Sequence, residues 1–219
     1  MLRALRRSRR EDGAVAVEAA LVIPLLCLLV FGMIEFAFVM RDYGSVSAMV
    51  RTGARIASTG ADHGPGDCDT DATAPPCAPA STPALAQEAA DAVQRSGVIS
   101  DPGMINYILV YKANNQGYPG PDGNTTMPSS CAGFSNCVMY KWRTNIGRFR
   151  YASGSWTSTS ISACFPGSAG HPMDRVGVAM DATHTMMTGL FGTTIGMHDH
   201  AVMDFEPLPT QSCGASEHQ

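Results

Sequence analysis

The chain has little positive charge outside its first 13 residues. Its 219 residues carry a formal net charge of −4. Residues 1–13 hold five arginines and two acids, a charge of +3, so residues 14–219 carry −7. Lysine is scarce and occurs only at Lys112 and Lys141. An acidic, lysine-poor chain lacks the basic surface that binds nucleic acid, so we exclude nucleic acid as a partner.

The sequence also lacks the short motifs that mark common active sites. It contains no nucleophile elbow, no phosphate-binding loop and no HExxH zinc motif. It has no CxxC pair either, which weakens the case for a zinc site or a thioredoxin-like redox centre. We therefore expect a protein that is not an enzyme, with no catalytic residues, no cofactor and no metal.

One group of histidines and acids deserves a test as a metal site. His198 and His200 alternate along an expected strand, so they would share one face of it. Other members of the group are His184, Asp181, Asp199 and Asp204. Histidines on strands are more often surface residues than ligands, so we expect these side chains to lie at the surface without binding a metal.

A long apolar segment, Ala14 to Met40, follows the basic leader. It has no charge from Ala19 to Ile34, and as a helix it would be roughly 40 Å long. A bilayer core needs about 20 apolar residues, so we predict a membrane-spanning helix over residues 14–40. The segment is too long for a cleavable secretory signal. A lipoprotein signal is disfavoured because Leu26, which is not small, precedes Cys27.

Arginines flank this segment unequally. Five precede it in the leader, residues 1–13, whereas only Arg41 follows it at once. The positive-inside rule then places the leader in the cytoplasm and residues 41–219 outside. We predict a single-pass protein of the cell membrane, with membrane lipid as one partner and an extracytoplasmic domain.

Two carboxylates interrupt the apolar segment. Glu35 lies near its end, and we expect this carboxylate to stay solvated at headgroup depth. Glu18 follows a basic leader, Gly13 and four small or apolar residues. That order resembles a class III (prepilin-type) signal, in which a membrane peptidase cuts after the glycine. The resemblance implies processing between Gly13 and Ala14.

The same resemblance implies that Glu18 acts in assembly. Cleavage would create a free amine on Ala14, and a carboxylate about one helical turn along can neutralise an amine inside lipid, where either charge alone is costly. In related pilins this pairing joins neighbouring subunits. Flp-type pilins usually have tyrosine after the glutamate, whereas this chain has Ala19, so the signal is closer to that of a pseudopilin.

Cysteine usage indicates export. Apart from Cys27, the chain has an even number of cysteines, all after the apolar segment: Cys68, Cys77, Cys131, Cys137, Cys164 and Cys213. This pattern predicts disulfides formed in an oxidising compartment. Many pairings are possible, and proximity favours Cys68–Cys77 and Cys131–Cys137 as loop clips. Cys164–Cys213 would then tie down the last segment.

The remainder of the sequence predicts an α+β domain. Residues 41–58 keep a helical stripe of small apolar residues that continues the membrane helix. A turn-rich loop over 60–82 precedes a short helix over 83–96, and a second long loop covers 114–136. Five segments are predicted as strands: Ile105–Lys112, Val138–Arg143, Arg148–Tyr151, Arg175–Thr183 and Ile195–Phe205. Residues 184–191 are predicted as a short helix or loop. Strands without regular intervening helices favour a mostly antiparallel sheet, the layout of pilins.

Taken as a whole, the chain resembles the TadE-like family of tight-adherence (Flp/Tad) pilus assembly proteins. The resemblance is carried by residues 13–58 and by the closing segment AVMDFEPLP, residues 201–209. It implies a non-catalytic minor pseudopilin that works with a prepilin peptidase, other pilins and pseudopilins, inner-membrane platform proteins and a secretion-type ATPase. The alternative is an uncleaved, membrane-anchored extracytoplasmic domain that binds a ligand or hydrolyses a substrate.

Overall fold

The computed structural model describes residues 4–66, 80–96, 101–164, 173–189, 192–209 and 211–213. It divides into two compact units. The first unit comprises Met1–Arg41 with Thr185–Ile195, and the second comprises Asp42–His184 with Gly196–Gln219. Each unit is described by itself. The long helix α1 contributes residues to both, and so do the two strands that flank residues 186–193.

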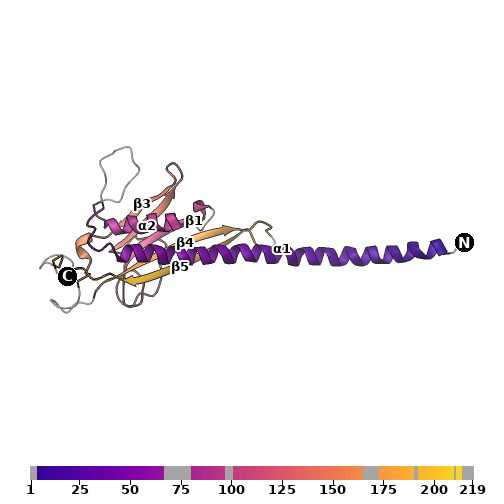
Figure 1. The fold of residues 1–219 in the computed structure, drawn as a ribbon, viewed down its shortest axis with the longest axis horizontal. Coiled ribbons are helices and arrows are strands. Elements are labelled where there is room, and N and C mark those ends of the chain that lie inside the picture. Colours follow the sequence, from indigo (N-terminus) through magenta and orange to yellow (C-terminus); the bar gives the residue numbers. More distant parts are fainter. Residues whose placement is uncertain are drawn as a thin grey trace. The chain divides into compact units, whose positions relative to one another are not determined.

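Helix α1 spans Ala4–Ser58 and contains 55 residues. It begins inside the basic leader, so the helix extends beyond the predicted membrane span, residues 14–40, at both ends (Figure 1). Pro24 lies within it without ending it. In the first unit, α1 is accompanied by the hairpin residues Thr185–Ile195.

The second unit is built on a five-stranded sheet in the order β3-β2-β1-β4-β5. The strands are β1 (Ile105–Ala113), β2 (Cys137–Arg143), β3 (Arg148–Ser155), β4 (Arg175–Thr185) and β5 (Thr194–Asp204). The pairs β1–β2, β1–β4 and β2–β3 are antiparallel. The other elements are α2 (Ala84–Ser96) and two short 3₁₀ helices, η1 (Pro102–Met104) and η2 (Ser158–Ser160). The predicted α+β class with an antiparallel sheet is confirmed.

The core lies between the helices and one face of the sheet. Because side chains alternate along a strand, Ile108 and Val110 of β1 point to the helices, whereas Leu109 and Tyr111 point to the opposite face. The predicted small-residue stripe of α1 is confirmed as buried: Val46, Met49, Val50, Gly53, Ala54 and Ala57. A Cβ added at Gly53 would lie only 2.8 Å from Val93 Cγ2 of α2. The small residues therefore allow the two helices and the sheet to approach closely.

The long loop over residues 114–136 covers the opposite face of the sheet. Asn114 organises it, since its amide donates to the carbonyls of Pro121 and Asn124 at 2.9 and 3.0 Å. The Asn114 side-chain oxygen accepts from the backbone N–H groups of Gln116 and Tyr118. The predicted loop is thus an ordered cover whose polar groups are satisfied internally.

The segment 184–191 was predicted as a short helix or loop, and residues 186–189 are a loop. The correction concerns His184 and Thr185, because β4 continues through them; β5 begins at Thr194. The two strands are joined as a hairpin, in which Met186 N–H donates to the Thr193 carbonyl at 2.9 Å. Gly189 (φ +67°) and Gly192 (φ +118°) occupy left-handed backbone conformations that suit a turn.

Two buried tyrosines on β1 and β2 are expected to respond oppositely to loss of their hydroxyls. Tyr111 donates to the Gly117 carbonyl at 3.0 Å, whereas the Tyr140 hydroxyl is buried with no hydrogen-bond partner among the described residues. Tyr111→Phe should lower the free energy of unfolding by about 1 kcal/mol, and Tyr140→Phe should raise it by a similar amount. Urea unfolding of the detergent-solubilised chain measures the free energy of unfolding of both variants. Equal losses of this free energy would contradict the difference in hydrogen bonding between the two hydroxyls.

The same tyrosines make stability sensitive to alkali. Burial, assisted by the nearby charge of Asp91, raises the pKa of Tyr140 well above its ordinary value of about 10. The unfolded chain therefore loses this proton first, so stability is full below about pH 10 and falls as pH rises beyond it. Tyr140→Phe should flatten this alkaline loss, which the same urea titrations at two pH values would detect.

Candidate functional site: the apolar helix and its carboxylates

The apolar part of α1 is covered by little of the protein. Among the large hydrophobic side chains from Val15 to Met40, most are exposed, with values such as 74% for Leu21 and 62% for Phe36. The most apolar 18-residue window has a mean hydropathy of 2.7, and none of it is buried. A continuous apolar surface of this size is costly in water. By length and composition, α1 can cross a membrane once, as expected for a single-pass anchor.

The residues predicted for processing and assembly lie at the start of this surface. Gly13, Ala14 and Glu18 are all helical and exposed. A Cβ added at Gly13 would meet nothing within 4 Å, so packing in the fold does not require glycine there. Glu18 follows Ala14 by four residues, the spacing that places two side chains on the same side of a helix. Among the described residues, Glu18 has no hydrogen-bond or ionic partner.

Glu35 behaves differently, and the expectation that it stays solvated is wrong. Its exposed fraction is only 3%. Its two carboxylate oxygens accept hydrogen bonds from the backbone N–H groups of Met187 and Thr188, at 2.5 and 3.0 Å. Both donors lie in the turn of the β4–β5 hairpin, within the same compact unit as Glu35.

These bonds compensate a charge that is removed from water. A hydrogen bond to an ionised group contributes about 1.5–3 kcal/mol, roughly twice a neutral one. Two successive backbone N–H groups aimed at one carboxylate also form a small anion-binding concavity. Glu35 therefore joins the helix to the hairpin, and sequence reasoning missed this because the donors are main-chain groups that carry no sequence signal.

The N-terminal residues that carry this geometry also carry a family likeness. The sequence model of the TadE-like protein family matches residues 13–55. This range lies wholly within α1 and includes Gly13, Glu18 and Glu35. The match confirms the resemblance stated from the sequence and suggests a component associated with the Tad pilus, whose TadE-like components are generally non-catalytic. No curated protein and no solved structure matches the chain.

Two cysteine pairs are joined in the second unit. Cys131–Cys137, which proximity along the sequence favours, and Cys164–Cys213, the pair that would then remain, form disulfides. Cys68 and Cys77 lie outside the described residues. Cys27 is a free thiol on the exposed surface of α1. The longer bridge ties the segment after β5 to Cys164, which also forms an isolated β-bridge with Leu208.

The histidine group is split between two environments. His198, Asp199 and His200 of β5 and Asp181 of β4 line a hollow of about 470 Å³. The ring of His200 lies 5.1 Å from that of Tyr118. Within the described part of the chain, no three His, Cys, Asp or Glu side chains are placed to hold a metal ion.

His184 is separate from these residues and pairs with α1. Its Nδ1 lies 2.7 Å from Asp42 Oδ2, and the two side chains are only 8% and 14% exposed. His184 Nε2 is buried with no hydrogen-bond partner among the described residues. This pair ties β4 to α1 within the second unit, so its role is structural.

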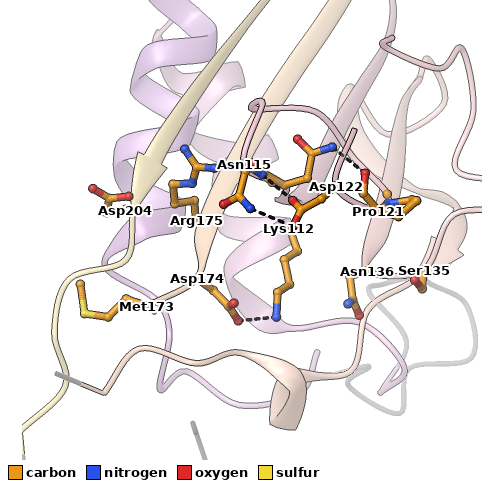
Figure 2. A pocket seen from close by; sticks show the side chains of 13 residues that line it. Lys112, Asn115, Pro121, Asp122, Ser135, Asn136, Met173, Asp174, Arg175 and Asp204 are labelled. Atoms are coloured by element: carbon orange, nitrogen blue, oxygen red, sulfur yellow. Dashed lines mark hydrogen bonds and ion pairs between the residues drawn. The ribbon is translucent and has the colours of Figure 1, made fainter. Parts of the chain in front are cut away.

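A cavity of about 650 Å³ lies at one end of the sheet, between β1, β4 and the loop over 114–136 (Figure 2). Lys112 Nζ lies 2.6 Å from Asp174 Oδ2, and Asn115 is hydrogen-bonded to Asp122. Arg175 donates to the Asn114 carbonyl. These polar groups bind one another: the Arg175 bond fastens the loop to β4, the Lys112–Asp174 pair joins β1 to the residue before β4, and the Asn115–Asp122 bonds lie within the loop.

The two disulfides should stabilise the second unit unequally. In the chain-entropy model, the bridge with a sequence separation of 49 contributes about 4 kcal/mol and the bridge with a separation of 6 about 2 kcal/mol. The double replacement Cys164→Ala with Cys213→Ala should therefore cost more than Cys131→Ala with Cys137→Ala. Urea unfolding compares the two variants, after mass spectrometry of non-reduced peptides has verified both bridges in the parent. Equal or reversed losses would contradict the prediction.

Proposed function

We propose that this protein is a minor pseudopilin of a Flp/Tad-type (type IVb) pilus or related secretion machine. The observation that carries the proposal is the family match over residues 13–55, which includes a glycine followed five residues later by a glutamate at the start of an exposed apolar helix. In this role residues 1–13 are a cytoplasmic leader, 14–40 cross the inner membrane and 41–219 form the extracytoplasmic domain. The two disulfides favour that placement, because they persist in oxidising compartments.

The first step of the proposed role is removal of the leader by a prepilin peptidase. Hydrolysis of the Gly13–Ala14 bond releases five arginines and leaves the amine of Ala14 as the new N-terminus. The arginines otherwise hold the N-terminus in the cytoplasm. The absence of any neighbour near Gly13 supports a requirement set by the peptidase, which needs close access to the bond, because the fold itself has room for a side chain.

The second step uses Glu18 as the counter-charge to the new amine. After cleavage Glu18 lies in the first turns of the helix, where the helix dipole and the amine both favour a negative charge. The Ala14 amine of the same chain or of a neighbouring pilin can take this place, since Glu18 is exposed and unpaired among the described residues. A charge without its partner is expensive in the membrane. The pair therefore favours association with other pilins and with the platform proteins of the inner membrane.

The variants Gly13→Leu and Glu18→Ala should fail at different steps. Gly13→Leu should keep the leader, seen as slower gel migration, and Gly44→Leu is the matched control because Gly44 is also an exposed helical glycine with nothing within 4 Å. Glu18→Ala should be cleaved at least partly but reduce assembled pili by on the order of tenfold or more, as expected for an unpaired charge in lipid. Glu18→Gln should behave like Glu18→Ala.

Assembly is measured by piliation or adherence in the same cells, with Glu11→Ala as the control for loss of an acid from the part that is cut away. N-terminal sequencing of the mature protein should find Ala14 first. A mature chain that begins at Met1 would favour the uncleaved ligand-binding or hydrolase alternative. Normal piliation with Glu18→Ala would refute the role of the glutamate.

A further inference from the structure

The turn of the β4–β5 hairpin combines an exposed apolar side chain with hydrogen bonds to the membrane helix. Met187 is 76% exposed, and its N–H, with that of Thr188, is bound by Glu35. We propose that this turn dips into the outer interfacial layer of the lipid bilayer beside α1, so that the protein contacts the membrane at two points. The inference rests on the proposed membrane anchoring but goes beyond it, because a single helix suffices as an anchor.

The hydrogen bonds to Glu35 fix the level of the turn along α1. Glu35 precedes Met40, the last residue of the apolar segment, by about 7.5 Å at 1.5 Å per residue. The helix around Glu35 presents exposed apolar side chains to its surroundings: Ile34 (48%), Phe36 (62%) and Phe38 (39%). The turn therefore lies beside the apolar part of α1, and lipid that covers these side chains also reaches Met187.

The chemistry of the hairpin suits that environment. Residues 185–195 contain no charged side chain. A backbone in lipid must have its polar groups satisfied within the protein. Here Met186 donates to the Thr193 carbonyl, and Met187 and Thr188 donate to Glu35. The same bonds allow the Glu35 carboxylate to lie at this depth, because its charge is screened from lipid by two donors and its exposure is 3%.

We favour membrane lipid over a second protein as the partner of Met187, because Met187 is continuous with the apolar surface of α1. Met187 adjoins the exposed apolar surface of α1, which runs from Val15 to Met40 and has the length and composition of a membrane span. A protein partner would need to cover Met187 at the edge of a surface that otherwise faces lipid. The position of the turn at the interface thus sets how far α1 enters the bilayer.

Depth-dependent quenching in vesicles tests the proposal. Full-length Met187→Trp and parent protein are reconstituted in phosphatidylcholine vesicles whose acyl chains carry bromine near the headgroup, near the chain end or nowhere. The emission of the added tryptophan is obtained as the difference from the parent. Bromine near the headgroup should remove about half or more of this emission, since tryptophan favours the interface, and bromine near the chain end should remove less.

Leu25→Trp serves as the reference for the anchor itself, because Leu25 is exposed on α1 about 15 Å deeper than Glu35 at 1.5 Å per residue. Its emission should be quenched most by bromine near the chain end. If Leu25→Trp is quenched in this way while Met187→Trp is quenched only by aqueous iodide, the anchor stands and the lipid contact of the turn is overturned. If neither quencher reaches Met187→Trp, a protein covers the turn, which also overturns the proposal. If bromine fails to quench Leu25→Trp, the membrane anchoring fails, and the inference with it.

A second change tests whether Glu35 holds the turn in place. Glu35→Ala in the Met187→Trp background should lower quenching by headgroup bromine and raise quenching by iodide, because the two N–H groups then need water. Glu206→Ala in the same background removes an exposed carboxylate from the second unit and should leave both signals unchanged. Identical quenching with and without Glu35 would show that its hydrogen bonds do not set the position of the turn.

Discussion

A carboxylate buried beside an apolar helix needs hydrogen-bond donors, and in this protein the turn of the β4–β5 hairpin supplies them. Glu35 takes its donors from the main chain of Met187 and Thr188. To supply them, β4 and β5 extend beyond the segments with clear strand character, and the turn uses glycine at two positions with positive φ. The end of the hairpin that supplies these donors belongs to the first unit, whereas the rest of the sheet belongs to the second.

The two acids of the apolar segment are in opposite states. Glu35 is buried and its charge is bound by backbone donors of its own chain. Glu18 is exposed and has no partner among the described residues. Burial of a charge is tolerated when it is hydrogen-bonded, and a charge without partners remains available for another molecule. The difference supports a structural role for Glu35 and an intermolecular role for Glu18.

The sequence predicts those parts of the structure that depend on local patterns. The small-residue stripe after the membrane segment, the β-rich second half and the Cys131–Cys137 bridge follow from periodicity, composition and proximity. The Glu35 contact could not be predicted, because its donors are backbone groups 152 and 153 residues away. The His184–Asp42 pair was missed for a related reason: its members are 142 residues apart, and neither lies in a recognisable motif. The loop over residues 186–189 agrees with one of the two predicted alternatives, but β4 runs two residues further than predicted, through His184 and Thr185.

In the proposed role, the exposed surface of α1 exchanges lipid for the apolar helices of neighbouring pilins. Lipid chains and such helices are similarly apolar, so the exchange itself provides little hydrophobic free energy. The groups that can discriminate between the two environments are then the polar ones. Glu35 discriminates little, because its hydrogen bonds are made within the chain and travel with it. Glu18 gains a partner only where an amine of the same or another subunit is present. The unsatisfied carboxylate, rather than the much larger apolar surface, is therefore the feature that selects assembly over residence in the bilayer.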